Sequence, residues 1–213
     1  MPLRSFHGGR ALKRWRYVGL FGEQLMACVA IVQVGPARQS FWALYERRER
    51  RLRQRTRLLP RRAALRLSPG LPRRRSAELD ALAVIDDTAG YHARHTEWWW
   101  AAGVGEATDG RAAAWNLVRG VNDPPTGSER AVWVGGEPHE PPPVSFTADL
   151  SSISCEDGSS LDFHAEAERS RRENLLIVKS DYRAPFGTFS GTLPGGIPLA
   201  SGLGVCEHHR ARW

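Results

Sequence analysis

The sequence predicts an all-β protein made of antiparallel strands. Short runs of β-branched and aromatic residues recur along the 213 residues, and the 21 glycines and 14 prolines supply turns between them. No segment keeps the periodicity of a long helix. Because open sheet edges invite aggregation, a sheet of about eleven strands is expected to close into a barrel or to pack as a sandwich.

Three strands are predicted within residues 1–48. Trp15–Phe21, Leu25–Val34 and Gln39–Tyr45 are rich in β-branched and aromatic residues, and a turn follows each of the first two. This first part of the chain is therefore expected to form an antiparallel meander.

Residues 49–78 form a second part, which is rich in arginine and interrupted by proline. Thirteen arginines fall within Arg47–Arg75. They belong to a wider asymmetry, since residues 1–80 hold 19 Lys and Arg against 5 Asp and Glu, whereas residues 81–213 hold 11 against 18. The segment is compatible with a solvated strand-and-loop region, with local disorder, or with a patch that binds nucleic acid or acidic lipid. We favour the solvated region and expect no nucleic-acid partner.

Strand signals recur at short intervals in residues 79–213, which are expected to form a C-terminal barrel. The Asp109-Gly110 pair predicts a hairpin between Glu97–Val104 and Arg111–Val118. Further strands are predicted at Glu78–Asp86, Arg130–Val134, Val144–Leu150, Asn174–Lys179, Gly187–Leu193 and Ile197–Cys206.

The segment Leu161–Glu168 shows the clearest strand alternation. Apolar and polar residues alternate without a break, which is typical of a strand with one buried face. The residues expected to face inward are Leu161, Phe163, Ala165 and Ala167.

Several function classes lack sequence support. Cys28, Cys155 and Cys206 are widely spaced and form no CxxC pair, which favours a reducing compartment over a disulfide framework. HExxH, Walker, GxSxG and strand–GxGxxG–helix motifs are absent, so no metal or cofactor is expected. No secretory signal is visible, and no apolar run reaches the roughly 20 residues of a membrane span. A cytoplasmic protein without a transmembrane segment is expected.

The segment DDTAGYHARHTEWWW, residues 86–100, concentrates the residues with chemical potential. Asp86 and Asp87 follow a predicted strand, which favours an Asx-turn in which the carboxylates accept backbone N–H groups. The alternative is a carboxylic acid at a barrel mouth, with a raised pKa that keeps a proton available near neutral pH. Such an acid could protonate an alkene, and nearby indole rings would stabilise the resulting cation.

His92 and His95 lie three residues apart, where a loop enters a strand. In a strand such positions point to opposite sides, so a shared metal ion is not expected. Each is a candidate acid or base, although a hydrogen-bonded residue at a strand end is the commoner case. Alternation also places Trp98 and Trp100 on one face and Trp99 on the other, either as core residues or as part of a ligand cavity.

The candidate residues form two sets. The candidate catalytic residues are Asp86, Asp87, His92 and His95. The candidate ligand contacts are Tyr91, Trp98, Trp100, Trp115, Asn116 and Tyr182. The second set combines aromatic side chains with polar positions at strand ends, where the loops of a barrel mouth would lie.

Seven motifs resemble the bacterial family known as domain of unknown function 2804. They are KRWRYVGLFG, ARQSFWALYER, VIDDTAGYHARHT, AWNLVRGVNDPP, SERAVWV, AEAERSRRENLLIVKSDYRAPFGTFSGTLPGG and the closing ARW. The resemblance covers most of residues 10–48 and 80–213. It implies a distant relationship to tandem lipocalin-like barrels, a group similar to carotenoid hydratases and tocopherol cyclases. It assigns no catalytic residue.

The region 49–79 departs from this family, because it is shorter than the corresponding region of other members. The resemblance therefore implies lipocalin-like antiparallel barrels, one complete and one partial. The leading functional expectation is a protein that binds a hydrophobic small molecule, either a lipid or an isoprenoid. One alternative is an acid-catalysed hydratase or cyclase acting on an isoprenoid-type substrate. The other is an interaction module that binds anions through its arginine-rich segment.

Overall fold

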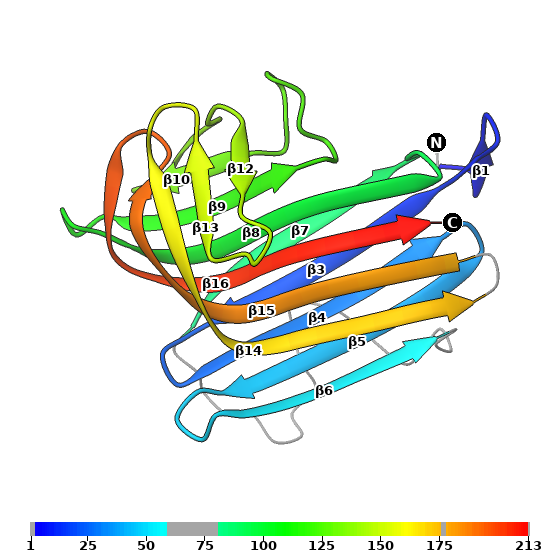
Figure 1. The fold of residues 1–213 in the computed structure, drawn as a ribbon, viewed down its shortest axis with the longest axis horizontal. Helices are drawn as coiled ribbons and strands as arrows, with labels where there is room; N and C mark the ends of the chain where they lie inside the picture. Colours follow the sequence, from blue (N-terminus) through cyan, green and yellow to red (C-terminus); the bar gives the residue numbers. More distant parts are fainter. Residues whose placement is uncertain (1–2, 59–80, 176–177, 213) are drawn as a thin grey trace. The chain divides into compact units, whose positions relative to one another are not determined.

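The computed structural model describes residues 3–58, 81–175 and 178–212, and Figure 1 shows them as strands joined by turns and loops. These residues contain no helix, and so none that could cross a membrane. The predicted all-β, antiparallel class is confirmed. The strands are β1 (Phe6–His7), β2 (Arg10–Ala11), β3 (Lys13–Phe21), β4 (Leu25–Val34), β5 (Ala37–Glu46), β6 (Arg51–Leu58), β7 (Leu82–Gly90), β8 (His95–Ala107), β9 (Ala112–Arg119), β10 (Ala131–Val134), β11 (Glu137–His139), β12 (Val144–Phe146), β13 (Ser152–Cys155), β14 (Ser160–Leu175), β15 (Val178–Leu193) and β16 (Ile197–Arg212).

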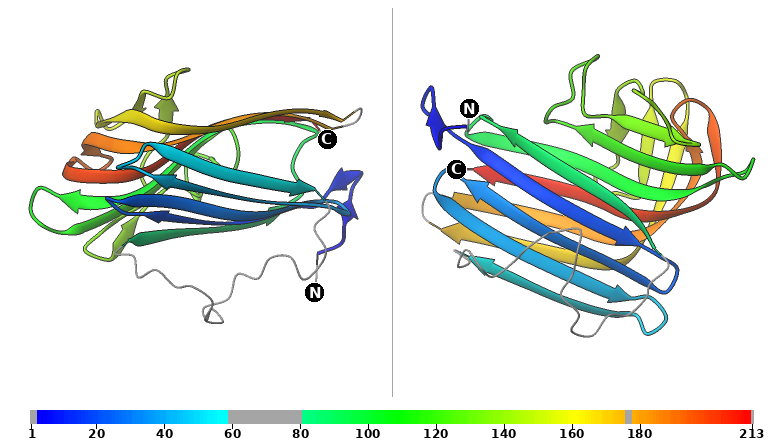
Figure 2. Two further views of the ribbon diagram at one scale, coloured as in Figure 1. Left: turned by 90° about the horizontal axis from the view of Figure 1, so that it is seen from below. Right: turned by 180° about the vertical axis from the view of Figure 1, so that it is seen from behind.

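The chain divides into two compact units. Unit 1 comprises Met1–Glu46 and Leu52–His92, and unit 2 comprises Arg47–Arg51 and Ala93–Trp213. The main sheet of unit 1 has the strand order β6-β5-β4-β3-β7. The predicted N-terminal meander is confirmed, because β3, β4 and β5 pair in sequence, as Figure 2 shows in blue.

The meander has one buried face and one exposed face. On β3, Tyr17 and Phe21 are buried, whereas Arg14 and Arg16, which precede Tyr17, are exposed. Met26 of β4 pairs with Phe21 and is also buried. The alternation of arginine and aromatic residues in RWRY, residues 14–17, thus follows the two sides of the sheet.

The arginine-rich part begins as an exposed strand. Strand β6 (Arg51–Leu58) joins the edge of the sheet beside β5. Its sequence RLRQRTRL alternates arginine with other residues, so its arginines fall on one side. The remainder of the predicted arginine-rich segment, residues 59–78, lies outside the described residues.

The predicted turn at Asp86-Asp87 is wrong. Strand β7 continues through both residues to Gly90 and pairs with β3 along its whole length. Asp86 lies opposite Tyr17, and Asp87 lies opposite Arg16. The strand persists because both carboxylates find side-chain donors on β3, so they do not need the backbone N–H groups of an Asx-turn.

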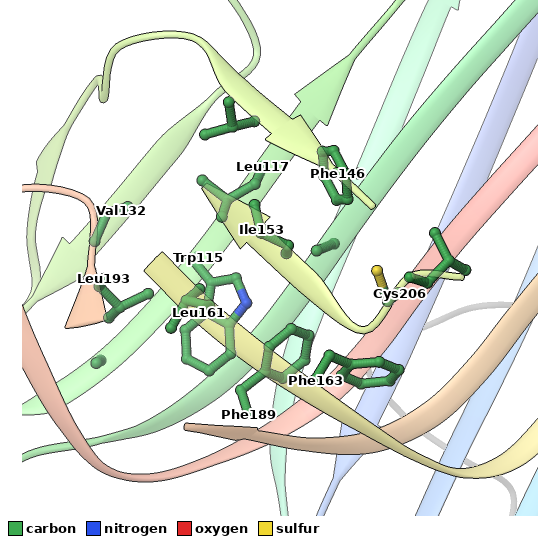
Figure 3. Close-up of a cluster of buried hydrophobic side chains, with 14 of the residues drawn as sticks. Trp115, Leu117, Val132, Phe146, Ile153, Leu161, Phe163, Phe189, Leu193 and Cys206 are labelled. Carbon is green, nitrogen blue, oxygen red and sulfur yellow. The ribbon is translucent and has the colours of Figure 1, made fainter. Parts of the chain in front are cut away.

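Unit 2 is a nine-stranded antiparallel sheet that curls into a half-barrel. Its order is β11-β10-β9-β8-β16-β15-β14-β13-β12, and β12 approaches β9 across the concave side. The predicted hairpin between β8 and β9 is confirmed, with Gly110 at a φ of 84° in the turn. The concave side encloses a core contributed by strands on both sides of the curl, in which Figure 3 shows Trp115, Phe163 and Phe189 close together.

A β-bulge corrects the predicted alternation of Leu161–Glu168. Leu161 and Phe163 are buried in the core as predicted. Between Ala165 and Ala167, however, β14 contains one extra residue relative to β15. The bulge moves Ala167 to the opposite face from Phe163, so the four predicted inward residues do not share one side.

The predicted strand Asn174–Lys179 is also corrected. Asn174 belongs to the end of β14, and Lys179 belongs to the start of β15, where the two residues pair with each other. The apolar run therefore spans the end of one strand and the start of the next.

Candidate functional site

The residues of DDTAGYHARHTEWWW are divided between the two units. Asp86, Asp87 and His92 belong to unit 1, whereas His95 begins β8 in unit 2. Asp86 and Asp87 point to opposite faces of β7, and His95 is exposed. The structure therefore does not gather the four candidate catalytic residues within either unit.

Asp86 belongs to a polar cluster on the buried face of unit 1. One carboxylate oxygen accepts a hydrogen bond from the indole Nε1 of Trp15 at 2.7 Å, and the other accepts one from the hydroxyl of Thr88 at 2.9 Å. His92 follows β7, and its ring stacks on Trp15 with a centroid distance of 5.8 Å. The register also places Lys13 on this face, because Lys13 is two residues before Trp15 on β3.

Burial changes the acid–base properties of this cluster. Lys13 is only 4% exposed, and loss of hydration lowers its pKa from 10.5 to about 7. Burial also lowers the pKa of His92, and the nearby Lys13 charge lowers it further. The cluster therefore contains an amine that changes charge near neutral pH and a histidine that favours its neutral form.

Asp87 and Tyr91 have contacts of a different kind. Asp87 forms an ion pair with Arg16, and its second oxygen lies 4.0 Å from Arg14. The Tyr91 hydroxyl donates a hydrogen bond to the carbonyl of Arg4 at 2.8 Å. Both sets of contacts hold the edge of the unit 1 sheet to its neighbours.

Unit 2 places two of the three consecutive tryptophans on one side of its sheet. Trp98 lies opposite His209 and Trp100 lies opposite Glu207, whereas Trp99 lies opposite His208. The predicted division of the tryptophans between two faces is confirmed. We call the side with Trp98 and Trp100 the aromatic face.

Tyr182 and Asn116 also lie on the aromatic face. Tyr182 pairs with His209 across β15 and β16. Asn116 accepts a hydrogen bond from the indole Nε1 of Trp100 at 2.6 Å, and it donates one to the carbonyl of Glu129. Four of the six candidate ligand contacts therefore share one face of one sheet.

Trp115 lies on the other side of the sheet. It pairs with Gly103, is fully buried, and meets Phe189 edge-on at a centroid distance of 5.1 Å. Trp115 is thus a core residue of the half-barrel and does not contribute to the aromatic face.

The aromatic face also carries a polar group of residues that the sequence pattern does not predict, Ser180, His209 and Glu207, which we call the polar relay. His209 Nε2 lies 2.8 Å from the hydroxyl of Ser180, and His209 Nδ1 lies 3.7 Å from a carboxylate oxygen of Glu207. The same Glu207 oxygen accepts a hydrogen bond from Trp98 Nε1 at 3.1 Å. The His209 and Trp98 rings contact each other, with centroids 4.2 Å apart.

The relay was not predicted because the last strand is longer than its sequence pattern indicates. The sequence pattern predicts that the last strand ends at Cys206, but β16 continues to Arg212. Extending the alternation through EHHRAR would have placed Glu207 and His209 on one side and His208 on the other. Their partner Ser180 comes from the adjacent strand, and nothing in the local sequence signals that pairing.

A family profile for "Domain of unknown function (DUF2804)" matches residues 72–213. The chain belongs to the DUF2804 family. This confirms the family resemblance identified from the motifs, and the matched region contains β7 and all of unit 2 after residue 92.

Two solved structures resemble this DUF2804 protein at low sequence identity. A Nitrosomonas europaea protein assigned as AttH is 11% identical, with a TM-score of 0.43, and the match covers 95% of this chain and 93% of that one. Kievitone hydratase from Nectria haematococca is 8% identical, with a TM-score of 0.44, and the match covers 96% and 89%. No curated protein matches the sequence.

On the aromatic face of this DUF2804 protein, Tyr182 is also covered by a cation. The guanidinium of buried Arg169 lies 4.6 Å from the Tyr182 ring centroid. Arg169 reaches this side because the bulge after Ala165 reverses the facing of the second half of β14. The electron-rich face of the phenol ring attracts the guanidinium, so Arg169 and Tyr182 form a cation–π contact.

The opposite face of the same strands carries a different arrangement. Trp99 stacks on His208 at a centroid distance of 4.6 Å, and the Arg119 guanidinium lies 5.3 Å from the Trp99 ring. Glu97 accepts hydrogen bonds from Arg210 and His208, which lower its pKa. Trp99 and His208 are therefore natural controls for Trp98 and His209, one residue away on the other side.

No metal centre is visible in the part of the chain that the structure describes, because no three His, Cys, Asp or Glu residues gather there with suitable geometry. Glu207 and His209 supply two such groups, and their third neighbour is the hydroxyl of Ser180. This composition suits hydrogen bonding and proton transfer.

Proposed function

We propose that this DUF2804 protein binds a hydrophobic small molecule, a lipid or an isoprenoid, against the aromatic face of unit 2. The observation that carries the proposal is the strand register that brings Trp98, Trp100 and Tyr182 to one side of the sheet. Ligand sites in proteins are mostly apolar and aromatic, with a few convergent polar groups that fix orientation.

The polar residues of this face favour an amphipathic ligand. His209, Ser180 and Asn116 lie among the aromatic rings and offer both donors and acceptors. A ligand with an apolar chain and one hydroxyl or carbonyl group would match both features. A long unsaturated alcohol or fatty acid has this composition.

Ligand binding is tested with delipidated protein and cis-parinaric acid, a fluorescent polyene fatty acid. We expect Trp98→Leu to weaken binding by about tenfold, the equivalent of roughly 1.4 kcal/mol of lost contact. Trp99→Leu is the matched control, because it removes the same side chain from the next position on the other face. Equal affinity for wild type and Trp98→Leu, or an equal loss in both variants, would contradict the proposal.

Two further measurements support that comparison. The melting temperatures of both variants establish that each is folded when the titration is made. Mass spectrometry of organic extracts from freshly purified protein shows whether a lipid or isoprenoid copurifies with wild type and is depleted in Trp98→Leu. Together they separate lost contact from lost structure.

A second candidate function is acid–base chemistry on an isoprenoid-type alkene, centred on His209. The observation that favours it is the position of His209, held between Ser180 and Glu207 and in contact with Trp98. Proton addition to an alkene carbon gives a cation, which an indole face stabilises. Water then supplies the oxygen in hydration, or an internal alkene closes a ring, and a proton returns to the base.

Incubating the protein in D2O with unsaturated isoprenoid alcohols tests this chemistry. Turnover places deuterium on carbon, and mass spectrometry detects the added mass whichever product forms. We expect His209→Gln to reduce incorporation at least a hundredfold, within the usual range for loss of an acid–base group. His208→Gln and Asp86→Asn should retain it, since neither residue lies on the aromatic face. Incorporation that survives His209→Gln would exclude this role.

A further inference from the structure

The exposed side of the unit 1 sheet is strongly cationic. Arg14 and Arg16 of β3 lie on this side. Arg14 pairs with Gln33 of β4, which pairs with Arg38 of β5, so Arg38 lies on the same side. Arg53 of β6 belongs to it as well, because its Nε lies 3.8 Å from the carboxylate of Glu46. We call this side the arginine face.

Two more arginines extend the arginine face along its edge. Arg55 and Arg57 follow Arg53 at intervals of two residues on β6, so all three project from the same side of the strand. All three are exposed. Successive members of this row are separated by about 7 Å, the length of two strand residues.

The described residues of this face carry few negative charges. Asp87 pairs with Arg16 and Arg14 at one edge, and Glu46 lies near Arg53 at the other. Arg51 at the start of β6 is paired with Glu49. The other six arginines against two carboxylates leave a local excess of four positive charges. Arg55 and Arg57 are the members of the row furthest from Glu46 along the strand.

Exposed apolar side chains lie on the same face. Leu20, Trp42 and Ile85 are 37%, 39% and 69% exposed. Their pairings with Ala27, Val29 and Val18 place them on the arginine side of the sheet. Aliphatic and indole groups among arginines match the boundary of a bilayer, where apolar groups enter the acyl region and cations meet head groups.

We propose that the arginine face docks unit 1 onto a membrane surface that contains anionic phospholipids. Each arginine near such a surface contributes about 1 kcal/mol, so the three members of the β6 row supply a substantial electrostatic attraction. Single-stranded nucleic acid is less well matched, because such binding uses several stacked aromatic platforms. Among the described residues of this face, Trp42 is the exposed aromatic side chain, and its exposed large neighbours are aliphatic.

Vesicle co-sedimentation of the full chain tests the proposal. Vesicles of phosphatidylcholine alone are compared with vesicles containing about one third phosphatidylglycerol, at low and high salt. We expect binding to the anionic vesicles that weakens as salt rises. The triple variant Arg53→Gln, Arg55→Gln, Arg57→Gln should lower the partition coefficient on the order of 100-fold at low salt.

A matched triple variant controls for net charge. Arg94, Arg111 and Arg212 are exposed residues of unit 2, and their replacement by Gln lowers the net charge by the same three units. This variant should bind anionic vesicles like wild type, apart from a small long-range effect. Trp42→Ser should weaken the binding that persists at high salt. Melting temperatures establish that all variants are folded.

Three outcomes would overturn the proposal. The first is an unchanged partition coefficient for the Arg53, Arg55 and Arg57 variant. The second is an equal loss in the control triple, which would assign the attraction to net charge alone. The third is tighter binding to oligothymidylate than to anionic vesicles under the same salt conditions, which would assign the face to nucleic acid.

Discussion

Lys13 places an ammonium group on the buried face of the unit 1 sheet. It is the first residue of β3 and shares its side with Trp15 and Tyr17, whereas Arg14 and Arg16 point to the exposed side. The strand alternation therefore fixes the position of Lys13, although a lysine in such an arginine-rich stretch is easily interpreted as solvated. Loss of hydration is the cause of its lowered pKa.

The Lys13 pKa predicts how stability depends on pH. In the unfolded chain the amine stays protonated up to about pH 10.5, whereas in the folded protein it loses its proton near pH 7. Between these values the unfolded state binds more protons, so the free energy of unfolding rises with pH across this window. Below pH 7 both states are charged, and the folded state retains the full penalty of burial.

Lys13→Met is expected to stabilise the protein at pH 6, on the order of 2 kcal/mol, because the buried charge is replaced by an apolar side chain of similar length. It should also flatten the dependence of stability between pH 7 and 10. Urea unfolding at pH 6, 8 and 10 measures both effects. Arg14→Gln, at the adjacent exposed position, should preserve the wild-type slope. If Lys13→Met retains the full wild-type slope of unfolding free energy against pH, Lys13 is not the cause of that slope.

His92 is expected to make the free energy of unfolding depend further on pH, in the acid range. Its folded-state pKa lies below 6.5, because burial and the Lys13 charge disfavour the imidazolium. The sign follows from the same linkage: as pH falls below 6.5, the unfolded chain takes up a proton before the folded protein does, so stability declines. His92→Gln should reduce the loss of melting temperature between pH 7 and 5. His95→Gln, which changes an exposed histidine, is the control and should leave that loss intact.

At the scale of the elements, a row of small residues determines how the unit 2 sheet packs. Gly103 of β8 pairs with Gly204 of β16, which pairs with Gly187 of β15, which in turn pairs with Ala165 of β14. The indole of Trp115 lies over Gly103 and would collide with a Cβ at that position. The motif GVG at 103–105 thus serves close packing in a strand.

Gly103→Ala is expected to destabilise unit 2 by about 1 to 3 kcal/mol, the usual range for overpacking a filled core. The test is a double-mutant cycle with Trp115→Leu, measured by urea unfolding. If the collision with the indole is the cause, Gly103→Ala should be at least about 1 kcal/mol less damaging in the Trp115→Leu background. Additive effects would instead assign the loss to the backbone carbonyl of Leu203, which also lies close to the added Cβ.

The elements also show which structural rules a sequence can reveal. Strand positions in the meander, the β8–β9 hairpin and the division of the tryptophans followed from alternation and turn residues. Alternation failed at the Ala165 bulge, because an inserted residue reverses facing without any change of composition. The turn expected at Asp86-Asp87 failed as well, because cross-strand donors 71 positions away hold both carboxylates in a strand.

The candidate site was predictable to a similar extent. The position of Trp98 and Trp100 on one face follows from strand alternation in WWW alone, so the sequence predicts it. Predicting the relay would also require the pairing of β15 with β16, which brings Ser180 next to His209 across 29 positions of sequence. Non-local pairings of this kind depend on the whole sheet, so local patterns do not determine them.

At the scale of the whole molecule, positive charge is concentrated in the first part of the chain, residues 1–80. The cationic excess of residues 1–80 includes the arginine face, where Arg55 and Arg57 of β6 form no ion pair with the described residues. Several arginines of unit 2 are paired instead, as Arg183 is with Glu168, Arg172 with Asp181 and Arg111 with Asp109. A charge-matched variant in unit 2 lowers the net charge equally without changing a residue of the arginine face, so it separates a local surface effect from net charge.

The three cysteines report on the two units separately. Cys28 is buried in the sheet of unit 1, Cys206 is buried in the core of unit 2, and Cys155 is partly exposed at the end of β13. Burial raises the pKa of the thiols of Cys155 and Cys206, which reduces the reactive thiolate at neutral pH. Each buried thiol can react only when its own surroundings open.

A thiol-reactive reagent such as Ellman's should therefore modify the native protein in order of exposure. We expect Cys155 to react first, and Cys28 and Cys206 to react only as fast as their units open, with all three reacting at once in denaturant. Single-cysteine variants identify each phase, and rising urea concentration shows whether Cys28 and Cys206 respond with the same slope. Equal slopes and amplitudes would mean that the two units open together, and different slopes would mean that they open independently. Fast modification of Cys206 in native protein would contradict its placement in the unit 2 core.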